Sequence, residues 1–138
     1  MLGRLALSDA GLGLTDPLDF DLDVPVYAQI KNRLTFAIGR GAYAADAQLP
    51  SVRALARALL VNPNTVVRVY RELEQEGLIY SRRGKGVFVA AQAARRCRKE
   101  GQALVEDKLR EALALARRAQ LEGDELEALW RELRGSAG

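Results

Sequence analysis

Histidine is absent from this chain of 138 residues, and cysteine occurs only once, at Cys97. A disulfide bond within the chain is therefore impossible, and a metal site of clustered histidines and cysteines is disfavoured. Without an imidazole, the Ser-His-Asp and Cys-His forms of nucleophilic catalysis also lack their general base. The sequence thus predicts neither a cofactor nor a metal ion, and it argues against an enzyme.

Long apolar runs are missing as well, since none approaches the roughly 18 residues that a membrane-spanning helix needs. The segment Met1–Ala10 also lacks the continuous apolar stretch of a secretory signal peptide. We therefore expect a cytoplasmic protein with no membrane partner. Its composition, 49% hydrophobic and 28% charged, is typical of a folded soluble chain.

The net charge of +3 is unevenly distributed along the chain. Residues 1–24 carry one basic and five acidic side chains, whereas residues 25–90 carry ten basic and four acidic ones. Residues 91–138 are nearly balanced, with ten basic and nine acidic side chains. A basic central segment is expected of a unit that binds a polyanion such as nucleic acid. We therefore predict an N-terminal arm (1–24), a central domain (25–90) and a tail (91–138).

The N-terminal arm ends in Asp19–Val24, where three apolar residues alternate with three aspartates. This period of two predicts a short strand with the aspartates on one face. A calcium-binding loop is excluded, because its sixth position would hold Val24 instead of glycine and its twelfth Ile30 instead of glutamate.

The first helix of the central domain is predicted to open at Pro25, whose fixed φ suits a first helical turn, and to end at Gly39 and Gly41. Its apolar stripe repeats every four residues, at Val26, Ile30, Leu34 and Ile38. A second helix follows Ser51, a good N-cap residue. Its predicted buried face consists of Leu55, Ala56, Leu59 and Leu60.

A third helix begins almost at once, because Asn62 is a suitable N-cap and Pro63 suits the first helical position. Two helices joined by so tight a turn are typical of a helix-turn-helix. The third helix is predicted to run to about Glu76, with Gly77 in the left-handed conformation after it. Its helical period predicts two faces: an inner one of Val66, Val69, Tyr70 and Leu73, and an outer one of Asn64, Val67, Arg68 and Arg71.

Two β-prone segments, 78–81 and 87–89, flank the basic, glycine-bearing stretch Arg82–Gly86. This pattern predicts a β-hairpin with a basic tip, which is called a wing when it accompanies a helix-turn-helix. A phosphate-binding P-loop is excluded, because the stretch is too short for the Gly-x4-Gly-Lys-Ser/Thr motif. The predicted fold class is therefore mainly α with a small β-hairpin wing, a winged helix-turn-helix followed by a two-helix tail.

The tail predicts two amphipathic helices that Gly123 separates, with Asp124 as the cap of the last one. Such helices cannot bury both apolar faces alone, so we expect them to form the interface of a homodimer. We assign this interface to Leu109, Leu113, Leu126, Leu129, Trp130 and Leu133. The basic run at 95–99 is interpreted as a solvated helix end, and Cys97 as a small buried filler instead of a redox sensor.

Five stretches, in unbroken order over about residues 20–90, closely resemble the GntR family of bacterial regulators: Val24–Ile30, Leu49–Arg53, Asn62–Val66, Tyr70–Ile79 and Arg83–Val89. Only 48 residues follow the wing, which is too few for the large C-terminal domains of most GntR proteins. The short tail is similar to that of the YtrA subfamily. This resemblance implies a dimeric repressor of a DNA operator, often one that controls transporter genes.

The resemblance and the outer helix face together define candidate DNA contacts. Asn64 is suited to adenine and Arg68 to guanine, while Thr65 would touch a phosphate or a thymine methyl. Arg71 lies further along the helix and is the weaker candidate. By the resemblance, Arg53 would contact the DNA backbone or a base edge. Phosphate or minor-groove contacts are expected from Ser51, Arg82, Arg83, Lys85 and Gly86. Other GntR branches carry base-reading arginines where Pro63 and Val67 stand here, so those contacts are not implied.

Other interpretations stay open at this point. Asn64 and Thr65 would also suit a mere helix start, and Arg68 and Arg71 would also pair with Glu72 and Glu74. The alternative function is a winged-helix module for protein contacts, with an acidic partner on its basic face, although Asn64 and Arg68 beside a basic wing favour DNA. Whether a small-molecule effector exists, and what it is, the sequence leaves open. The predicted function is a homodimeric, sequence-specific repressor of a palindromic operator. Transporter genes and its own gene are candidate targets, but the sequence does not identify the regulated genes.

Overall fold

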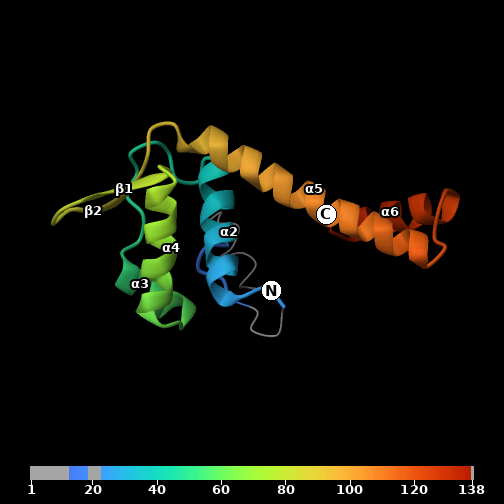
Figure 1. Ribbon diagram of the computed structural model, residues 1–138, viewed down its shortest axis with the longest axis horizontal. Coiled ribbons are helices and arrows are strands. Elements are labelled where there is room, and N and C mark those ends of the chain that lie inside the picture. The colour runs from blue at the N-terminus through green and yellow to red at the C-terminus, as the bar shows by residue number, and fades with distance from the viewer. Residues whose placement is uncertain (1–12, 19–22, 138) are drawn as a thin grey trace. The chain divides into compact units, whose positions relative to one another are not determined.

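The computed structural model describes residues 13–18 and 23–137 (Figure 1). The elements in these residues are α2 (Val26–Gly39), α3 (Val52–Leu59), α4 (Pro63–Gln75), β1 (Ile79–Arg82), β2 (Gly86–Val89), α5 (Ala93–Arg118) and α6 (Asp124–Ala137). The predicted class, mainly helical with a small antiparallel hairpin, is confirmed. Most of the strand expected in the N-terminal arm, residues 19–22, lies outside the described residues.

The chain divides into two compact units, Met1–Gly101 and Gln102–Gly138, so α5 begins in one and ends in the other. The first unit extends past residue 91, where the composition placed the start of the tail, because Ala93 and Cys97 are buried in its core. Gly39 permits this packing at the end of α2. A Cβ at Gly39 would lie 2.8 Å from the backbone nitrogen of Arg98.

Helix α4 packs against both α2 and α3 in the first unit (Figure 1). The helical period predicted its buried face correctly as Val66, Val69, Tyr70 and Leu73. The hydroxyl of Tyr70 donates a hydrogen bond to the carbonyl of Pro50 at 2.6 Å, which joins α4 to the segment before α3. Burial raises the pKa of this hydroxyl above its ordinary value, so it stays a donor. The stripe on α2 is also confirmed, since Ile30, Leu34 and Ile38 are completely buried.

Two side-chain caps fix the helix-turn-helix. Ser51 Oγ accepts a hydrogen bond from the N–H of Ala54 at 3.1 Å, and Asn62 Oδ1 accepts one from the N–H of Asn64 at 2.8 Å. Both predicted N-caps are therefore confirmed, and Pro63 is the first residue of α4. Each cap satisfies a backbone donor that has no acceptor within its own helix.

Two other helix starts differ from the prediction by one position. Pro25 is the residue before α2 and has extended backbone angles, so the helix begins at Val26. Asp124 is the first residue of α6 instead of its cap. It lies in an acidic first turn, where carboxylates interact favourably with the positive end of the helix dipole.

The turn between α3 and α4 corrects one core assignment. Leu60 was predicted to be buried, but 85% of it is exposed. Helix α3 ends at Leu59, and Leu60 has a φ of 57° and a ψ of 46°, in the left-handed region. This conformation turns the side chain away from the face on which Leu55 and Leu59 are buried. Leucine is disfavoured there, because its Cβ approaches the following carbonyl.

Replacing Leu60 by asparagine is expected to raise the free energy of unfolding by about 0.5–1 kcal/mol, because asparagine tolerates the left-handed region. The control is Leu60→Ala, which lacks the short polar side chain whose local hydrogen bonds let asparagine tolerate this region, and it should give no comparable gain. Urea unfolding followed by circular dichroism measures both variants. A loss of stability in Leu60→Asn would show that the leucine side chain makes a stabilising contact after all.

The single thiol, Cys97, is completely buried in the first unit. Desolvation raises its pKa to about 11, and the nearby Glu100 adds to this effect. We therefore expect a thiol reagent at about pH 8 to leave native protein unmodified and to label urea-unfolded protein fully. Fast labelling of the native protein would contradict the assignment of Cys97 as a core filler.

Arg33 of α2 holds the described part of the N-terminal arm. Its guanidinium donates to the carbonyl oxygens of Gly13, at 2.8 Å, Asp16 and Pro17, at 2.9 Å. Leu14 and Leu18 of the same segment are buried in the core. Residues 13–18 therefore belong to the packed body of the first unit.

The second unit comprises the end of α5 and α6, joined by a turn in which Gln120 and Gly123 have positive φ. No side chain between residues 102 and 136 is buried. Leu109 is 44% exposed, Leu113 is 50% and Trp130 is 47%. Large apolar side chains of this kind, on helices without a core of their own, require a partner surface in water.

Candidate nucleic-acid interface

The outer face of α4 carries the residues proposed to read bases. Asn64 and Arg71 are both exposed, and neither side chain has a hydrogen-bond or ion-pair partner among the described residues. Thr65, in the first turn, is half-buried. Asn64 donates its backbone N–H to the Asn62 cap, so its amide side chain is free of any capping task.

Arg68 lies on the same helix but is engaged by its neighbours. Its guanidinium carbon stands 3.7 Å from the centre of the Tyr27 ring, and its Nε lies 3.3 Å from Glu72 Oε2. Glu72 also binds Lys31 of α2 at 3.3 Å. Burial acts to raise the pKa of Glu72, but the hydrogen bonds from Lys31 and Arg68 hold this pKa below its ordinary value. Of the two alternatives left open for Arg68, the structure shows the pairing with Glu72.

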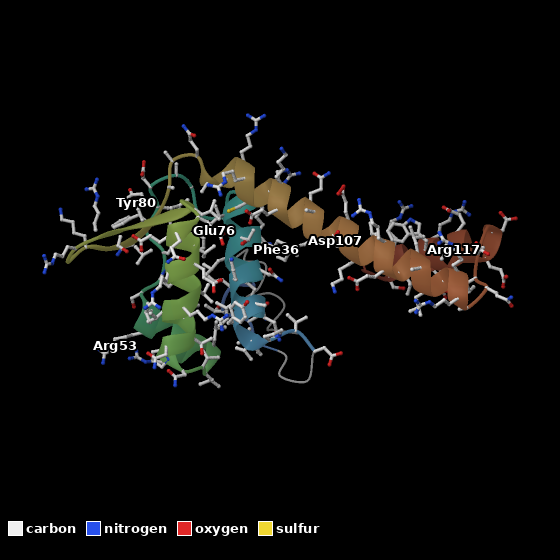
Figure 2. All side chains as sticks on the ribbon, in the orientation of Figure 1. Phe36, Arg53, Glu76, Tyr80, Asp107 and Arg117 are labelled. Carbon is white, nitrogen blue, oxygen red and sulfur yellow. The ribbon has the colours of Figure 1, made fainter. Side chains whose placement is uncertain are left out.

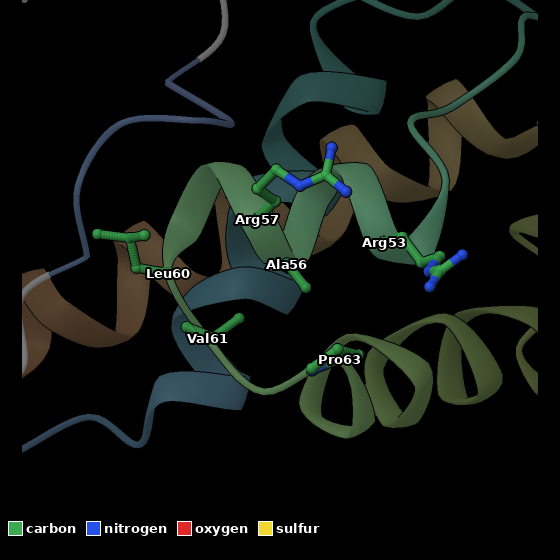
Figure 3. A pocket seen from close by; sticks show the side chains of 6 residues that line it. All are labelled: Arg53, Ala56, Arg57, Leu60, Val61 and Pro63. Carbon is green, nitrogen blue, oxygen red and sulfur yellow. The ribbon is translucent and has the colours of Figure 1, made fainter.

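A basic surface also borders the turn that precedes α4. A shallow pocket of about 340 Å³ is lined by Arg53, Ala56, Arg57, Leu60, Val61 and Pro63 (Figure 3). Arg53 and Arg57 stand one turn apart on α3, and both are exposed. Figure 2 shows Arg53 pointing away from the helices of the first unit. Arg57 was not among the predicted site residues, although its spacing from Arg53 was visible in the sequence.

The wing is a regular hairpin in which Ile79 pairs with Val89 and Arg82 with Gly86. The N–H of Lys85 closes the turn on the carbonyl of Arg82 at 2.8 Å. All three basic tip residues, Arg82, Arg83 and Lys85, are exposed. The predicted wing therefore presents its charges to solvent, as a phosphate-binding element must.

Hydrogen bonds connect the wing to the helices. Glu74 of α4 accepts from Ser81 twice, from its N–H at 3.3 Å and its hydroxyl at 3.2 Å. Tyr80 of β1, labelled in Figure 2, donates its hydroxyl to Asp46 at 2.7 Å and stacks on Phe88. The Glu74–Ser81 bonds join β1 to α4, and the Tyr80–Asp46 bond joins it to the segment before α3. None of these bonds follows a local sequence pattern, because each joins residues that only the folded chain brings together.

The candidate residues therefore fall into two groups. The candidate DNA contacts all lie in the first unit: Ser51, Arg53, Asn64, Thr65, Arg68, Arg71, Arg82, Arg83, Lys85 and Gly86. The predicted dimer residues, from Leu109 to Leu133, belong to the second unit. No helix within the described residues is long and apolar enough to cross a membrane.

Comparison with known proteins identifies the family to which this winged helix-turn-helix belongs. The family model of bacterial regulatory proteins, gntR family, matches residues 26–89. The transcriptional repressor YtrA of Bacillus subtilis is 31% identical over 109 residues, which cover 79% of this chain and 84% of YtrA. The chain belongs to the GntR family. Its winged helix-turn-helix coincides with the part that the family model matches.

Solved GntR structures agree with this assignment. A GntR family transcriptional regulator from Listeria monocytogenes is 31% identical, with a TM-score of 0.65, over 82% of this chain and 98% of that one. The DNA-binding domain of AraR, solved in complex with the operator ORX1, is 30% identical with a TM-score of 0.51. That match covers 54% of this chain and 95% of the AraR domain. This GntR protein is a DNA-binding transcriptional regulator.

Proposed function

We propose that the protein is a homodimeric repressor that binds a palindromic operator through α4 and the wing. The observation that carries this proposal is the exposed surface of the first unit. This surface carries Asn64, Arg71 and the three basic residues of the wing tip. Within the described residues, none of these side chains has a hydrogen-bond or ion-pair partner, and only Arg82 has a ring contact, with Tyr80. The Glu74–Ser81 hydrogen bonds fix the wing beside the helix.

Base reading is assigned to the first turns of α4. In a helix-turn-helix, the N-terminal residues of the recognition helix reach base edges in the major groove. Asn64 is suited to a bidentate pair with adenine, and Thr65 to a phosphate or a thymine methyl. Arg71 is free to approach DNA, whereas Arg68 must first leave Tyr27 and Glu72 to pair with guanine. We propose Asn64 as the principal reader.

Backbone contacts are assigned to the two sides of α4. On one side, Ser51 and Arg53 at the start of α3 would contact phosphates, with Arg57 adding a further charge. On the other side are Arg82, Arg83, Lys85 and the backbone at Gly86. Such contacts fix the register of a protein on DNA but carry little sequence information.

The second unit is proposed as the dimer interface. Its exposed apolar residues include Leu109, Leu113, Leu129, Trp130 and Leu133, and Leu126 is partly exposed. A second copy of the same helices would cover these faces symmetrically. A symmetric dimer then presents two copies of α4 to two half-sites, about one helical turn of DNA apart. The YtrA relative is a repressor. We propose that this protein also represses transcription and has no enzymatic activity.

Selection from a library of random DNA duplexes tests this proposal. We expect the purified full-length protein to enrich an inverted repeat whose half-sites lie about 34 Å apart. A single half-site or a direct repeat would contradict the symmetric dimer. No enrichment at all would contradict specific DNA binding and would favour a module for protein contacts. The enriched sequence is called the selected duplex below.

A further inference from the structure

The segment before α3 acts as a third strand at the base of the wing. The N–H of Asp46 donates to Val89 at 2.8 Å, and the N–H of Leu49 donates to Val87 at 2.8 Å. The N–H of Val89 donates in return to Ala47 at 3.0 Å. Between these bonds, Gln48 forms a β-bridge with Phe88. The hairpin base is thus joined to the body of the first unit by backbone hydrogen bonds.

Gln48 extends this connection to the wing tip. Its Nε2 donates a hydrogen bond of 2.9 Å to the carbonyl oxygen of Lys85, in the turn of the hairpin. Gly86, the next residue, leaves the space that the amide needs. A Cβ at Gly86 would lie 2.5 Å from Gln48 Nε2, and the φ of +123° there also disfavours any other residue.

The tip of the hairpin depends on the Gln48–Lys85 hydrogen bond more than the base of the hairpin does. A hairpin of two four-residue strands is marginally stable alone, and three cationic side chains repel one another at its end. Among the described residues, the turn itself has the bond from Lys85 to Arg82. Within the described residues, the hydrogen bond of Gln48 is the only one that reaches the tip from outside the hairpin. It therefore holds the tip against the segment before α3.

We propose that Gln48 is a positioning residue for DNA binding, which orders the wing tip before the operator arrives. It carries no charge, and it acts through Arg82, Arg83 and Lys85. Ordering a loop in advance removes an entropic cost from binding. The proposal rests on the proposed function, because it requires the wing to contact DNA.

The first test compares Gln48→Met with the wild type on the selected duplex. Methionine has the length of glutamine but cannot donate the hydrogen bond. Affinity is expected to fall about 3- to 10-fold, and the slope of log affinity against log salt should stay unchanged because no charge is lost. By contrast, Lys85→Ala should reduce the slope by about one for each wing. Gln92→Ala, at an exposed glutamine outside the wing, is the matched control and should bind as the wild type does.

The decisive test repeats Gln48→Met in a background in which Arg82, Arg83 and Lys85 are all alanine. If Gln48 acts through the tip, the substitution should cause no further loss there. An equal loss in both backgrounds would overturn the positioning role and show that Gln48 acts independently. If the triple alanine variant itself binds as tightly as the wild type, the wing does not contact DNA, and the proposed function of the wing fails first.

A measurement without DNA separates positioning from a general effect on stability. NMR relaxation should show the order parameter of the Lys85 amide falling from about 0.85 toward about 0.6 in Gln48→Met. The melting temperature and the order parameters of α4 should not change. An unchanged Lys85 order parameter would overturn the proposal.

Discussion

Replacing Leu109 and Leu113 together by aspartate is expected to make the protein monomeric and to weaken binding to the selected duplex by about 10²- to 10⁴-fold. Both leucines are about half exposed and lie on one face of α5. In a dimer, this face would have to bury two new carboxylates on each chain, which is unfavourable without cationic partners. A monomer binds one half-site at a time and loses the high effective concentration of the second α4.

The matched control places the same two charges on another side of α5, about 110° around the helix from the two leucines. Ala103→Asp together with Ala114→Asp adds the same charge, and both positions are exposed. This variant should remain dimeric in sedimentation velocity and keep most of its affinity. If the leucine variant also stays dimeric, the tail is not the interface, and the apolar residues of the second unit serve another contact.

Replacing Asn64 by alanine is expected to cost about 1–3 kcal/mol of binding free energy per half-site and to relax selectivity at one base pair. The loss follows from the bidentate hydrogen bond that only an amide gives to adenine. The fold should be unaffected, since the Asn64 side chain has no partner in the described structure and alanine is a better helix former. Anisotropy titrations with the selected duplex and with single-base variants of it measure both effects.

Gln75→Ala is the control, because Gln75 is exposed near the other end of the same helix. It should leave affinity and selectivity unchanged. If Asn64→Ala weakens binding to every sequence equally, Asn64 contacts the DNA backbone, and the base-reading role passes to Arg71 or Arg68.

Local signals made much of the fold predictable. The caps Ser51 and Asn62, and Gly77 after α4, are set by chemistry within a few residues, and the structure confirms them. The prediction for Leu60 was wrong, because its apolar character suggested burial. Its position depends on where α3 ends, and a one-residue difference there turns a core leucine into an exposed one.

The candidate site was predictable as a helix face but not as a set of free side chains. The helical period correctly placed Arg68 and Arg71 outside the core. Tyr27, on another helix, contacts Arg68, whereas the Arg71 side chain has no partner among the described residues. Gln48 gave no signal either, since its hydrogen bond to Lys85 joins segments that only the folded chain brings together.

The most direct test of a sequence-specific DNA-binding dimer is an anisotropy titration of the full-length wild type. It uses the selected duplex and a scrambled duplex of equal length, at about 50 mM and about 200 mM salt. We expect binding to the selected duplex to be at least about 10³-fold tighter, with a steep loss of affinity at the higher salt concentration on both duplexes. Equal affinity for the two duplexes, or no binding even at low salt, would contradict a function in reading an operator.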